Sequence, residues 1–282
     1  MNFNKQQLEA INSIKGNISV IATAGSGKTT VLINRMKNMI ENHGCEPSSI
    51  LAITFSRKAK ENILKKLDSS MKNINVETFH SLALKIIIST YGKNSYKVWT
   101  AYWEKEKMIQ DICVNLQGCN KDDVPVNEIL SFISLQKVHM LSPNDNLIFL
   151  SNLPYEEDSM RIIYKMYEEE KEKNSYIIFD DFLNIVNKIF DTHPDVLERY
   201  QSIFQYILVD EFQDVSLSQA LFLQKLNKTN TMIVGDPLQA IYAFRGGNSK
   251  YILNLDKDYS NTKVINLNVN YRCSKEIVNT AN

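Results

Sequence analysis

The chain has 282 residues, 44% of them hydrophobic, and its 32 basic and 32 acidic residues give a formal net charge of zero. This length favours two domains, and the balanced charge leaves a nucleic-acid partner open, because binding needs only a local basic patch. The four cysteines form no C-x-x-C pair, which argues against a disulfide framework or a zinc site. Without an apolar run of about 18 residues or a signal-peptide pattern, we expect a cytoplasmic protein with no membrane partner.

The chain opens with a helix signal. Asn4 can cap a helix that runs through Leu8 and Ile11, and Gln7 occupies the glutamine position of a capping box. Gln7 has two interpretations: a residue that only caps the helix, or a residue whose side chain also has a functional role.

A strand, a glycine-rich loop and a helix follow in that order. The β-branched run at 18–21 predicts a buried strand, and apolar residues spaced from Leu32 to Ile40 predict an amphipathic helix. Gly25 and Gly27 between them let the backbone wrap closely around an anion, and the helix N-terminus adds partial positive charge. This order is typical of a phosphate-binding loop.

Two side chains at the end of this loop have the chemistry that nucleotide binding needs. Lys28 can reach the β- and γ-phosphates, and Thr29 can bind Mg²⁺. An ordinary strand–turn–helix is the alternative, since Ala22 replaces the first glycine of the strict pattern.

Two more strands are predicted at 50–55 and 76–80, each followed by a helix. Phe55 beside Arg57 suits a surface that stacks bases and follows a nucleic-acid backbone, although a core phenylalanine at a strand end is the alternative. His80 has no metal partner at ligand spacing, so a buried or capping histidine is as well supported as a functional one.

The strand signal disappears between about residues 93 and 175, and polar, proline-bearing links separate three helical patterns. We therefore expect an all-helical insertion within an α/β domain. The predicted helices span Trp99 to Leu116, Ile129 to Val138, and Met160 to Glu172.

The α/β pattern returns with an apolar strand at 206–209 that ends in two carboxylates. Asp210 can hold Mg²⁺, and Glu211 can orient or deprotonate an attacking water. An acidic pair at a strand end often only caps the next helix, but its combination with a phosphate loop favours catalysis.

A further strand at 231–235 leads into a loop with functional side chains. Gln239 can sense a γ-phosphate, and Tyr242, Phe244 and Arg245 offer two stacking rings and a cation. The alternative is a loop packed by its own aromatic side chains. A last strand is predicted at 263–267.

Taken together, these stretches resemble the N-terminal half of UvrD/Rep/PcrA-type superfamily 1 DNA helicases, end to end and in the family's motif order. The matching motifs are Phe3-Asn-Lys-Gln-Gln7, Ala24 to Thr29, Ile53 to Ala59, Thr78-Phe-His-Ser81, Asp210-Glu-Phe-Gln-Asp214, Gly235 to Gly246, and Asn270-Tyr-Arg272.

The resemblance implies roles for particular residues. It implies a catalytic set of Lys28, Asp210, Glu211, Gln239 and Arg272, the last contacting the γ-phosphate. It implies ATP binding by Gln7, which reads adenine, by Ala24, Gly25, Ser26, Gly27, Lys28, Thr29 and Thr30, and by Tyr271, which stacks on adenine. It implies Mg²⁺ binding by Thr29 and Asp210. It implies a single-stranded DNA surface of Phe55, Arg57, Thr78, His80, Tyr242, Phe244 and Arg245.

The resemblance also implies a RecA-like P-loop domain with a parallel sheet, interrupted by an all-helical subdomain. The expected divisions are residues 1–91 and 178–267 for the motor domain, 92–177 for the helical insertion, and 268–282 for the start of a second motor domain that is otherwise missing.

The function expected from this likeness is ATP-dependent translocation on single-stranded DNA and helicase activity, as in DNA repair. The 282 residues alone are expected to be nearly inactive, because arginine fingers of the second motor domain are absent. The alternatives are a nucleotide- and DNA-binding module without turnover, or a subunit of a helicase–nuclease.

Overall fold

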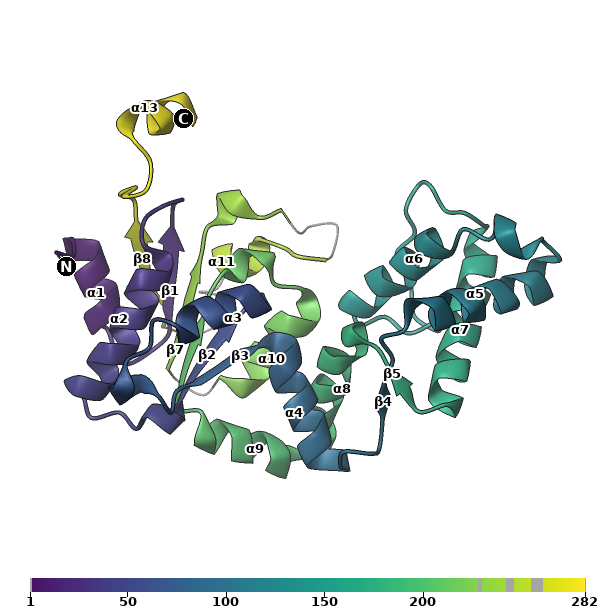
Figure 1. Cartoon of the computed structure of the whole chain (residues 1–282), viewed down its shortest axis with the longest axis horizontal. Coiled ribbons are helices and arrows are strands. Elements are labelled where there is room, and N and C mark those ends of the chain that lie inside the picture. Colours follow the sequence, from purple (N-terminus) through teal and green to yellow (C-terminus); the bar gives the residue numbers. More distant parts are fainter. Residues whose placement is uncertain (1, 228–229, 242–245, 255–260, 282) are drawn as a thin grey trace. The chain divides into compact units, whose positions relative to one another are not determined.

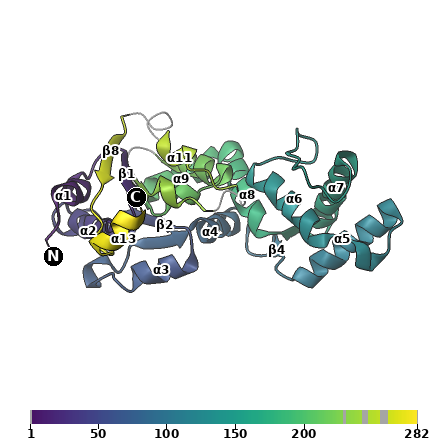
Figure 2. The ribbon, with the colours of Figure 1, turned by 90° about the horizontal axis from the view of Figure 1, so that it is seen from above.

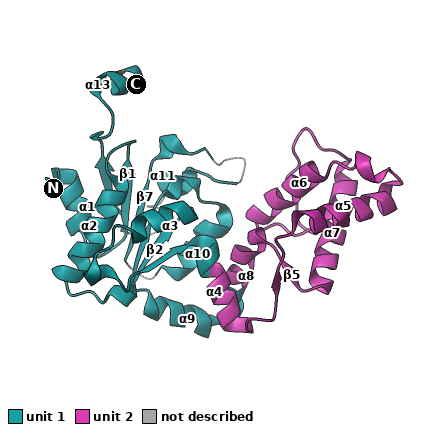
Figure 3. Cartoon of the chain, in the orientation of Figure 1, with its two compact units in different colours: residues 1–82, 189–282 teal, residues 83–188 magenta. Residues whose placement is uncertain are grey.

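The computed structural model describes residues 2–227, 230–241, 246–254 and 261–281. It divides into two compact units, residues 1–82 with 189–282, and residues 83–188 (Figure 3). Tyr242, Phe244 and Arg245 lie outside the described residues.

The first unit is built on a six-stranded sheet with the strand order β3-β2-β6-β7-β1-β8 (Figure 1). Every pairing in it is parallel, which confirms the expected α/β class. The strands are β1 (Ile18–Ala22), β2 (Ile50–Thr54), β3 (Asn75–Thr78), β6 (Tyr206–Val209), β7 (Thr231–Gly235) and β8 (Lys263–Leu267).

The central strands read as continuous apolar runs because helices cover both faces of a parallel sheet. Every residue of β2 and β7 is buried. The edge strand β8 instead exposes Lys263 and Val264 and buries Ile265 and Leu267. The sheet is therefore buried at its centre and partly open at this edge.

Helices α1, α2 and α3 pack on one face of the sheet, where apolar side chains of α1 and α2 join those of β1, β7 and β8 in one core. In the view from above, α3 lies on one side of β2, and α9 and α11 lie on the other (Figure 2). The helices of this unit are α1 (Lys5–Asn12), α2 (Lys28–Glu41), α3 (Arg57–Leu64), α9 (Pro194–Ile203), α10 (Leu217–Leu226), α11 (Lys250–Leu253) and α13 (Lys275–Ala281).

The sheet brings the sequence motifs together because parallel strands place their carboxyl ends at one edge. The phosphate-loop sequence follows β1, Asp210 follows β6 and Asp236 follows β7. Short 3-10 turns also belong to the fold, namely η1 (Pro47–Ser49), η2 (Ser69–Met71), η3 (Lys121–Asp123), η4 (Phe212–Asp214) and η5 (Pro237–Gln239).

The second unit consists mainly of α5 (Tyr102–Gln117), α6 (Val126–Val138) and α7 (Glu157–Lys173), packed around their own apolar core. Helices α4 (Phe79–Tyr91) and α8 (Phe179–Thr192) each have residues in both units, so this unit extends beyond the expected 92–177. Strands β4 (Lys97–Val98) and β5 (Tyr176–Ile177) form a two-residue parallel pairing that the sequence does not signal.

Two local expectations differ from the structure. Phe79 and His80 begin α4 instead of ending a strand, because Ser81 Oγ accepts from Thr78 N at 2.9 Å and Thr78 Oγ1 accepts from Ser81 N at 3.1 Å. Trp99 precedes α5, since its backbone N–H donates to Ile177 O at 2.8 Å. Among the described residues, no helix is long and apolar enough to cross a membrane.

Candidate functional site

The loop between β1 and α2 has a backbone that only glycine adopts easily. Gly25 and Gly27 have φ of 70° and 88°, in the left-handed region. A Cβ on Gly25 would lie 2.4 Å from Asn270 Oδ1, and one on Gly27 would lie 3.2 Å from Gln7 Nε2. Close approach on both sides therefore requires glycine at these positions.

This loop fits an anion. Gly27 is the N-cap of α2 and provides no side-chain cap for the helix. The Ser26 hydroxyl is buried without a hydrogen-bond partner among the described residues. Uncapped helix N–H groups and an unsatisfied hydroxyl are the donors that a phosphate group would satisfy.

A cavity of about 290 Å³ opens over the loop. Its lining contains most of the expected nucleotide-binding residues together with Lys66, which no motif indicated. The lining residues are Gly25, Ser26, Gly27, Lys28, Thr29, Thr30, Lys66, Glu211, Gln239, Tyr271 and Arg272. Of the remaining expected residues, Ala24 belongs to the same loop and is exposed.

Lys28 connects the loop to the ends of β6 and β7. Its Nζ donates to Gln239 Oε1 at 3.1 Å and lies 3.7 Å from Glu211 Oε2. The fold thus brings together three expected catalytic residues that are far apart in the sequence. Glu211 is 183 positions after Lys28, and Gln239 is 28 positions after Glu211.

Asp210 is 4% exposed at the end of β6, where Thr29 Oγ1 donates to its Oδ2 at 3.4 Å. Burial, and then the neighbouring Glu211 carboxylate, raises the pKa of Asp210 to about 6. A desolvated carboxylate gains most from a nearby cation.

The donor set at this position fits Mg²⁺ with a nucleotide. Among the described residues no group of three or more histidine, cysteine or acidic side chains could hold a metal alone. Mg²⁺ commonly takes only one or two protein oxygens and completes its octahedron with water and phosphate oxygens. Thr29 and Asp210 supply such a pair.

Glu211 adopts a strained backbone conformation with φ of 54°. Gln213 Nε2 donates to Glu211 Oε2 at 2.9 Å, and Gln213 Oε1 accepts from Asp236 N at 3.0 Å. Gly235 leaves room for this contact, because a Cβ there would lie 2.6 Å from Gln213 Oε1. Gln213 therefore joins the carboxylate after β6 to the backbone after β7.

Gln7 caps α1 and also contacts the phosphate loop. Its Oε1 accepts from Asn4 N at 3.1 Å, which completes the capping box, and its Nε2 donates to Ser26 O at 3.0 Å. Asn4 Nδ2 also donates to Tyr271 Oη at 2.8 Å, and Tyr271 N donates to Gly25 O at 2.9 Å. Residues near both ends of the chain therefore meet beside the loop.

The described residues expected to contact DNA follow β2 and β3, which pair in parallel. Arg57 is exposed, and Phe55 and His80 are half-buried. Thr78 is 8% exposed and its hydroxyl caps α4, so its contribution to an open surface is small.

The sequence profile of the family described as UvrD/REP helicase N-terminal domain matches residues 3–260. The chain belongs to this family. The motif order and the six-stranded parallel sheet are those expected of a RecA-like helicase domain, so the resemblance in the sequence is confirmed.

Relatives within the helicase family match nearly the whole chain. The YjcD protein of Bacillus subtilis (strain 168) is 36% identical over 296 aligned residues, covering 99% of this chain and 37% of the relative. Proteins named ATP-dependent DNA helicase PcrA, from Leuconostoc citreum and from Staphylococcus aureus (strain Mu50), are each 32% identical, covering 99% of this chain and 38% and 39% of the relatives. The chain thus spans well under half the length of these helicases.

Two residues at the candidate site were not among the residues predicted from the sequence. Gln213 lies inside the Asp-Glu-x-Gln-Asp motif. Its place in this motif, two residues after Glu211, is the sequence signal that could have indicated a hydrogen bond to that carboxylate. Lys66 follows α3 in a lysine-rich stretch, where nothing local distinguishes it from Lys65.

Proposed function

We propose that this chain is the ATP-binding motor portion of a helicase that couples ATP hydrolysis to movement along single-stranded DNA. The observation that supports this most is the meeting of an anion-binding loop with Lys28, Gln239 and the carboxylates of Asp210 and Glu211. The family and the names of the relatives support the same function.

In this proposal the loop holds the phosphates of ATP through backbone N–H groups, the Ser26 hydroxyl and the Lys28 ammonium group. Thr29 and Asp210 hold Mg²⁺, which neutralises phosphate charge when it is bound. Gln7, Tyr271 and Thr30 surround the nucleoside. The 3.7 Å approach of Lys28 to Glu211 marks a contact that Lys28 exchanges for phosphate oxygens.

Glu211 is the group that orients or deprotonates the attacking water, and Gln239 senses the γ-phosphate. Arg272 contributes positive charge from the segment after β8. Since Gln213 holds both Glu211 and the Asp236 backbone, movement after β7 is transmitted to the water-orienting carboxylate. Single-stranded DNA crosses a surface that contains Phe55, Arg57, Thr78, His80, Tyr242, Phe244 and Arg245.

A second candidate is a module that binds nucleotide and DNA without turnover. The chain spans 37–39% of the relatives, so turnover by residues 1–282 alone is a separate question from turnover by a full-length helicase. Arginine fingers contribute about 10³–10⁵ in turnover to P-loop enzymes, so residues 1–282 alone should hydrolyse ATP very slowly. Robust DNA-stimulated phosphate release by these residues would contradict this expectation.

The proposed nucleotide site is tested by calorimetry with Mg·ATP. Lys28→Ala should weaken binding roughly 100-fold, because it removes charge-assisted hydrogen bonds to phosphate. Lys72→Ala, at an exposed position after η2, is the matched control and should bind as the parent does. Equal affinity of Lys28→Ala and the parent would show that the loop is structural only.

Catalysis is tested separately with Glu211→Gln. This variant should bind Mg·ATP within a few-fold of the parent, because the carboxylate acts on water and contacts the nucleotide site only through its 3.7 Å approach to Lys28. Phosphate release should fall by roughly 10²–10⁴-fold where the parent turns over, the usual contribution of a positioned acid or base. Unchanged phosphate release would assign the role to another group.

A further inference from the structure

Arg35 is a buried cation in the second half of α2. Its side chain is 2% exposed, and its guanidinium donates to backbone carbonyl oxygens at the end of α1. Nη1 donates to Ala10 O at 2.8 Å and to Ser13 O, and Nη2 donates to Ile14 O at 3.2 Å. One planar group thus fastens the end of α1 and the turn after it to α2.

Burying a guanidinium at this position costs folding free energy. Burial lowers the pKa of Arg35 to about 10, so the group remains charged at neutral pH. A buried charge is costly unless hydrogen bonds compensate it, whereas an apolar side chain of similar volume would pack without this cost. The terminal carbonyls of a helix carry partial negative charge and favour a cation. The fork geometry fixes the position of α1 more closely than apolar packing could.

The two helices joined in this way both contact the phosphate loop. Helix α2 begins in the phosphate loop at Lys28, and α1 carries Gln7 near its first turn. Asn38 Nδ2, one turn beyond Arg35, adds a bond to Ile11 O at 3.2 Å. Gln7 in turn meets the loop through Ser26 O. The distance between Gln7 and the phosphate loop therefore depends on the contact between α1 and α2.

We propose that Arg35 is a positioning residue for base recognition, which clamps α1 to α2 and so sets the position of Gln7 that selects adenine over guanine. This inference rests on the proposed binding of ATP at the loop. Beyond its bonds to Asn4 N and Ser26 O, the Gln7 amide retains one lone pair on Oε1 and one N–H on Nε2. These match the 6-amino group and N7 of adenine, whereas guanine presents two acceptors there. Selectivity of this kind requires the amide to be held at a fixed distance from the phosphates.

The experiment measures the affinities of residues 1–282 for Mg·ATP and Mg·GTP by calorimetry, and compares their ratio among variants. Arg35→Lys keeps the charge but cannot reach all the carbonyls at once, so the ratio should fall about tenfold, the equivalent of one hydrogen bond. Lys37→Met removes an exposed cation two residues away and should leave the ratio unchanged.

A double-mutant cycle with Gln7→Ala separates positioning from general damage. Gln7→Ala alone should lower the ATP-to-GTP ratio, and Arg35→Lys should then have no further effect on it. A merely structural role would weaken both nucleotides equally and leave the ratio unchanged. An unchanged ratio in Arg35→Lys, or an equal fall with and without Gln7, overturns the inference while leaving ATP binding intact.

Asn38→Ala is a second variant for the same measurement, to be used if Arg35→Lys does not fold. It removes the weaker clamp from a partly exposed position and should lower the ratio two- to threefold, again only when Gln7 is present. If the parent itself binds no Mg·ATP, the proposed function fails and this inference fails with it. If Gln7→Ala leaves the ratio unchanged, the inference alone is wrong.

Discussion

Each of the two units buries a cluster of charged side chains, and the clusters differ in how completely they are neutralised. In the helical unit, Lys137 Nζ lies 2.6 Å from Asp181 and 2.8 Å from Glu168. Lys171 Nζ lies 2.7 Å and 3.0 Å from the same carboxylates. In the α/β unit, Asp210 and Glu211 face Lys28, whose nearest carboxylate oxygen is 3.7 Å away.

The difference lies in the number of close ion pairs that each cluster makes. Two cations and two anions satisfy one another in the helical unit. Asp181 and Glu168 outweigh burial at Lys137 and raise its pKa above its usual value, whereas burial and the neighbouring Lys137 lower the pKa of Lys171. At the phosphate loop, burial and the Glu211 carboxylate raise the pKa of Asp210, and no cation lies within ion-pair distance of it among the described residues. A buried carboxylate without a close cation is the kind of group that the proposed Mg·ATP site requires.

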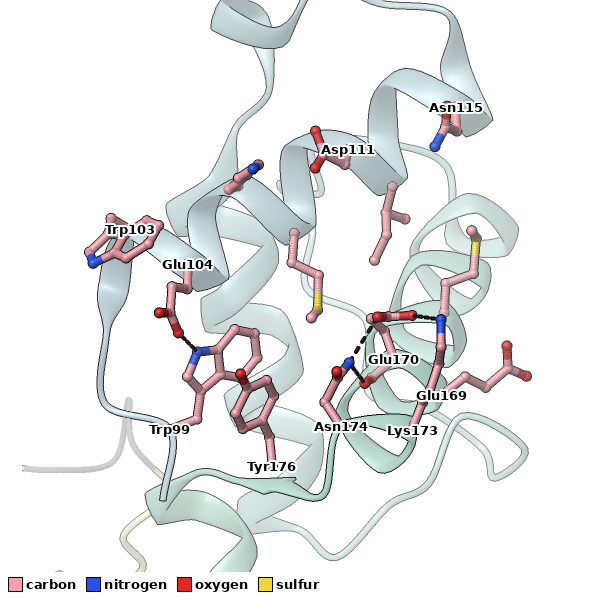
Figure 4. A pocket seen from close by; sticks show the side chains of 14 residues that line it. Trp99, Trp103, Glu104, Asp111, Asn115, Glu169, Glu170, Lys173, Asn174 and Tyr176 are labelled. Atoms are coloured by element: carbon pink, nitrogen blue, oxygen red, sulfur yellow. Dashed lines mark hydrogen bonds and ion pairs between the residues drawn. The ribbon is translucent and has the colours of Figure 1, made fainter. Parts of the chain in front are cut away.

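Cavity size alone leads to the wrong unit. A cavity of about 710 Å³ lies between α5 and α7, lined by aromatic, methionine and charged side chains (Figure 4). Some of its polar groups are paired with each other. Trp99 Nε1 donates to Glu104 Oε2 at 2.6 Å, and Asn174 Nδ2 donates to Glu170 Oε1 at 2.8 Å. In the lining of the smaller cavity at the phosphate loop, the Ser26 hydroxyl is buried without a hydrogen-bond partner among the described residues.

The largest effect is expected from breaking the neutral cluster. Lys137→Met leaves Asp181 with one cation fewer in a buried setting, and should destabilise the helical unit by about 3–5 kcal/mol. Mg·ATP affinity should be unchanged, since this cluster has no place in the proposed site. Denaturant unfolding followed by tryptophan fluorescence reports on this unit, because Trp99 and Trp103 are both in it. Lys165→Met, an exposed position on α7, is the control.

A smaller effect of opposite sign is expected from Asp210→Asn. The pKa of Asp210 is higher in the folded protein, about 6, than its ordinary 3.8. The folded state therefore holds a proton that the unfolded state has lost between these values, and stability falls as pH rises through this window. Asp210→Asn removes a penalty on the order of 1–3 kcal/mol above pH 6, and none below pH of about 4.

Thermal unfolding without Mg²⁺ at pH 4 and at pH 7.5 measures this effect. The variant should melt at a higher temperature than the parent at pH 7.5 and at the same temperature at pH 4. Asp195→Asn, an exposed position on α9, should show no such dependence. A constant difference between variant and parent at both pH values would mean that Asp210 carries no desolvation penalty.

The smallest effect is expected from replacing one buried glutamine in each unit, which compares the two units directly. Gln136 holds Ile148 in the helical unit by two bonds of 2.9 Å, as Gln213 holds Glu211 and Asp236 in the α/β unit. Gln136→Leu and Gln213→Leu should each cost about 1–2 kcal/mol of stability, because each leaves buried polar groups unsatisfied.

Only Gln213→Leu should also change ligand binding. It frees the Glu211 carboxylate beside Lys28, so Mg·ATP affinity should shift by a few-fold, whereas Gln136→Leu should leave it unchanged. Calorimetry on both variants makes the comparison. A similar shift in both would mean that Gln213 acts on stability alone.

Local sequence patterns determined much of this protein. The apolar runs at 50–54, 206–209 and 231–235 are the strands β2, β6 and β7, and the glycine loop lies between β1 and α2 as expected. These predictions succeed because strands and turns depend on residues that are neighbours in the sequence. The spacing of hydrophobic residues and the positions of glycines can therefore be recognised along the chain. The Asn4 capping box is confirmed for the same reason.

Only the tertiary structure decided which distant side chains meet. The strand order places β8 beside β1, which brings Tyr271 to Asn4 across 267 positions. Gln213 finds Asp236, and Arg35 finds the carbonyls of α1, through contacts that leave no periodic signal in the sequence. The hydrogen-bond partner of a buried polar group depends on which groups lie near it in the folded protein. A group with such a partner stabilises the fold, and a group without one is available to bind a ligand.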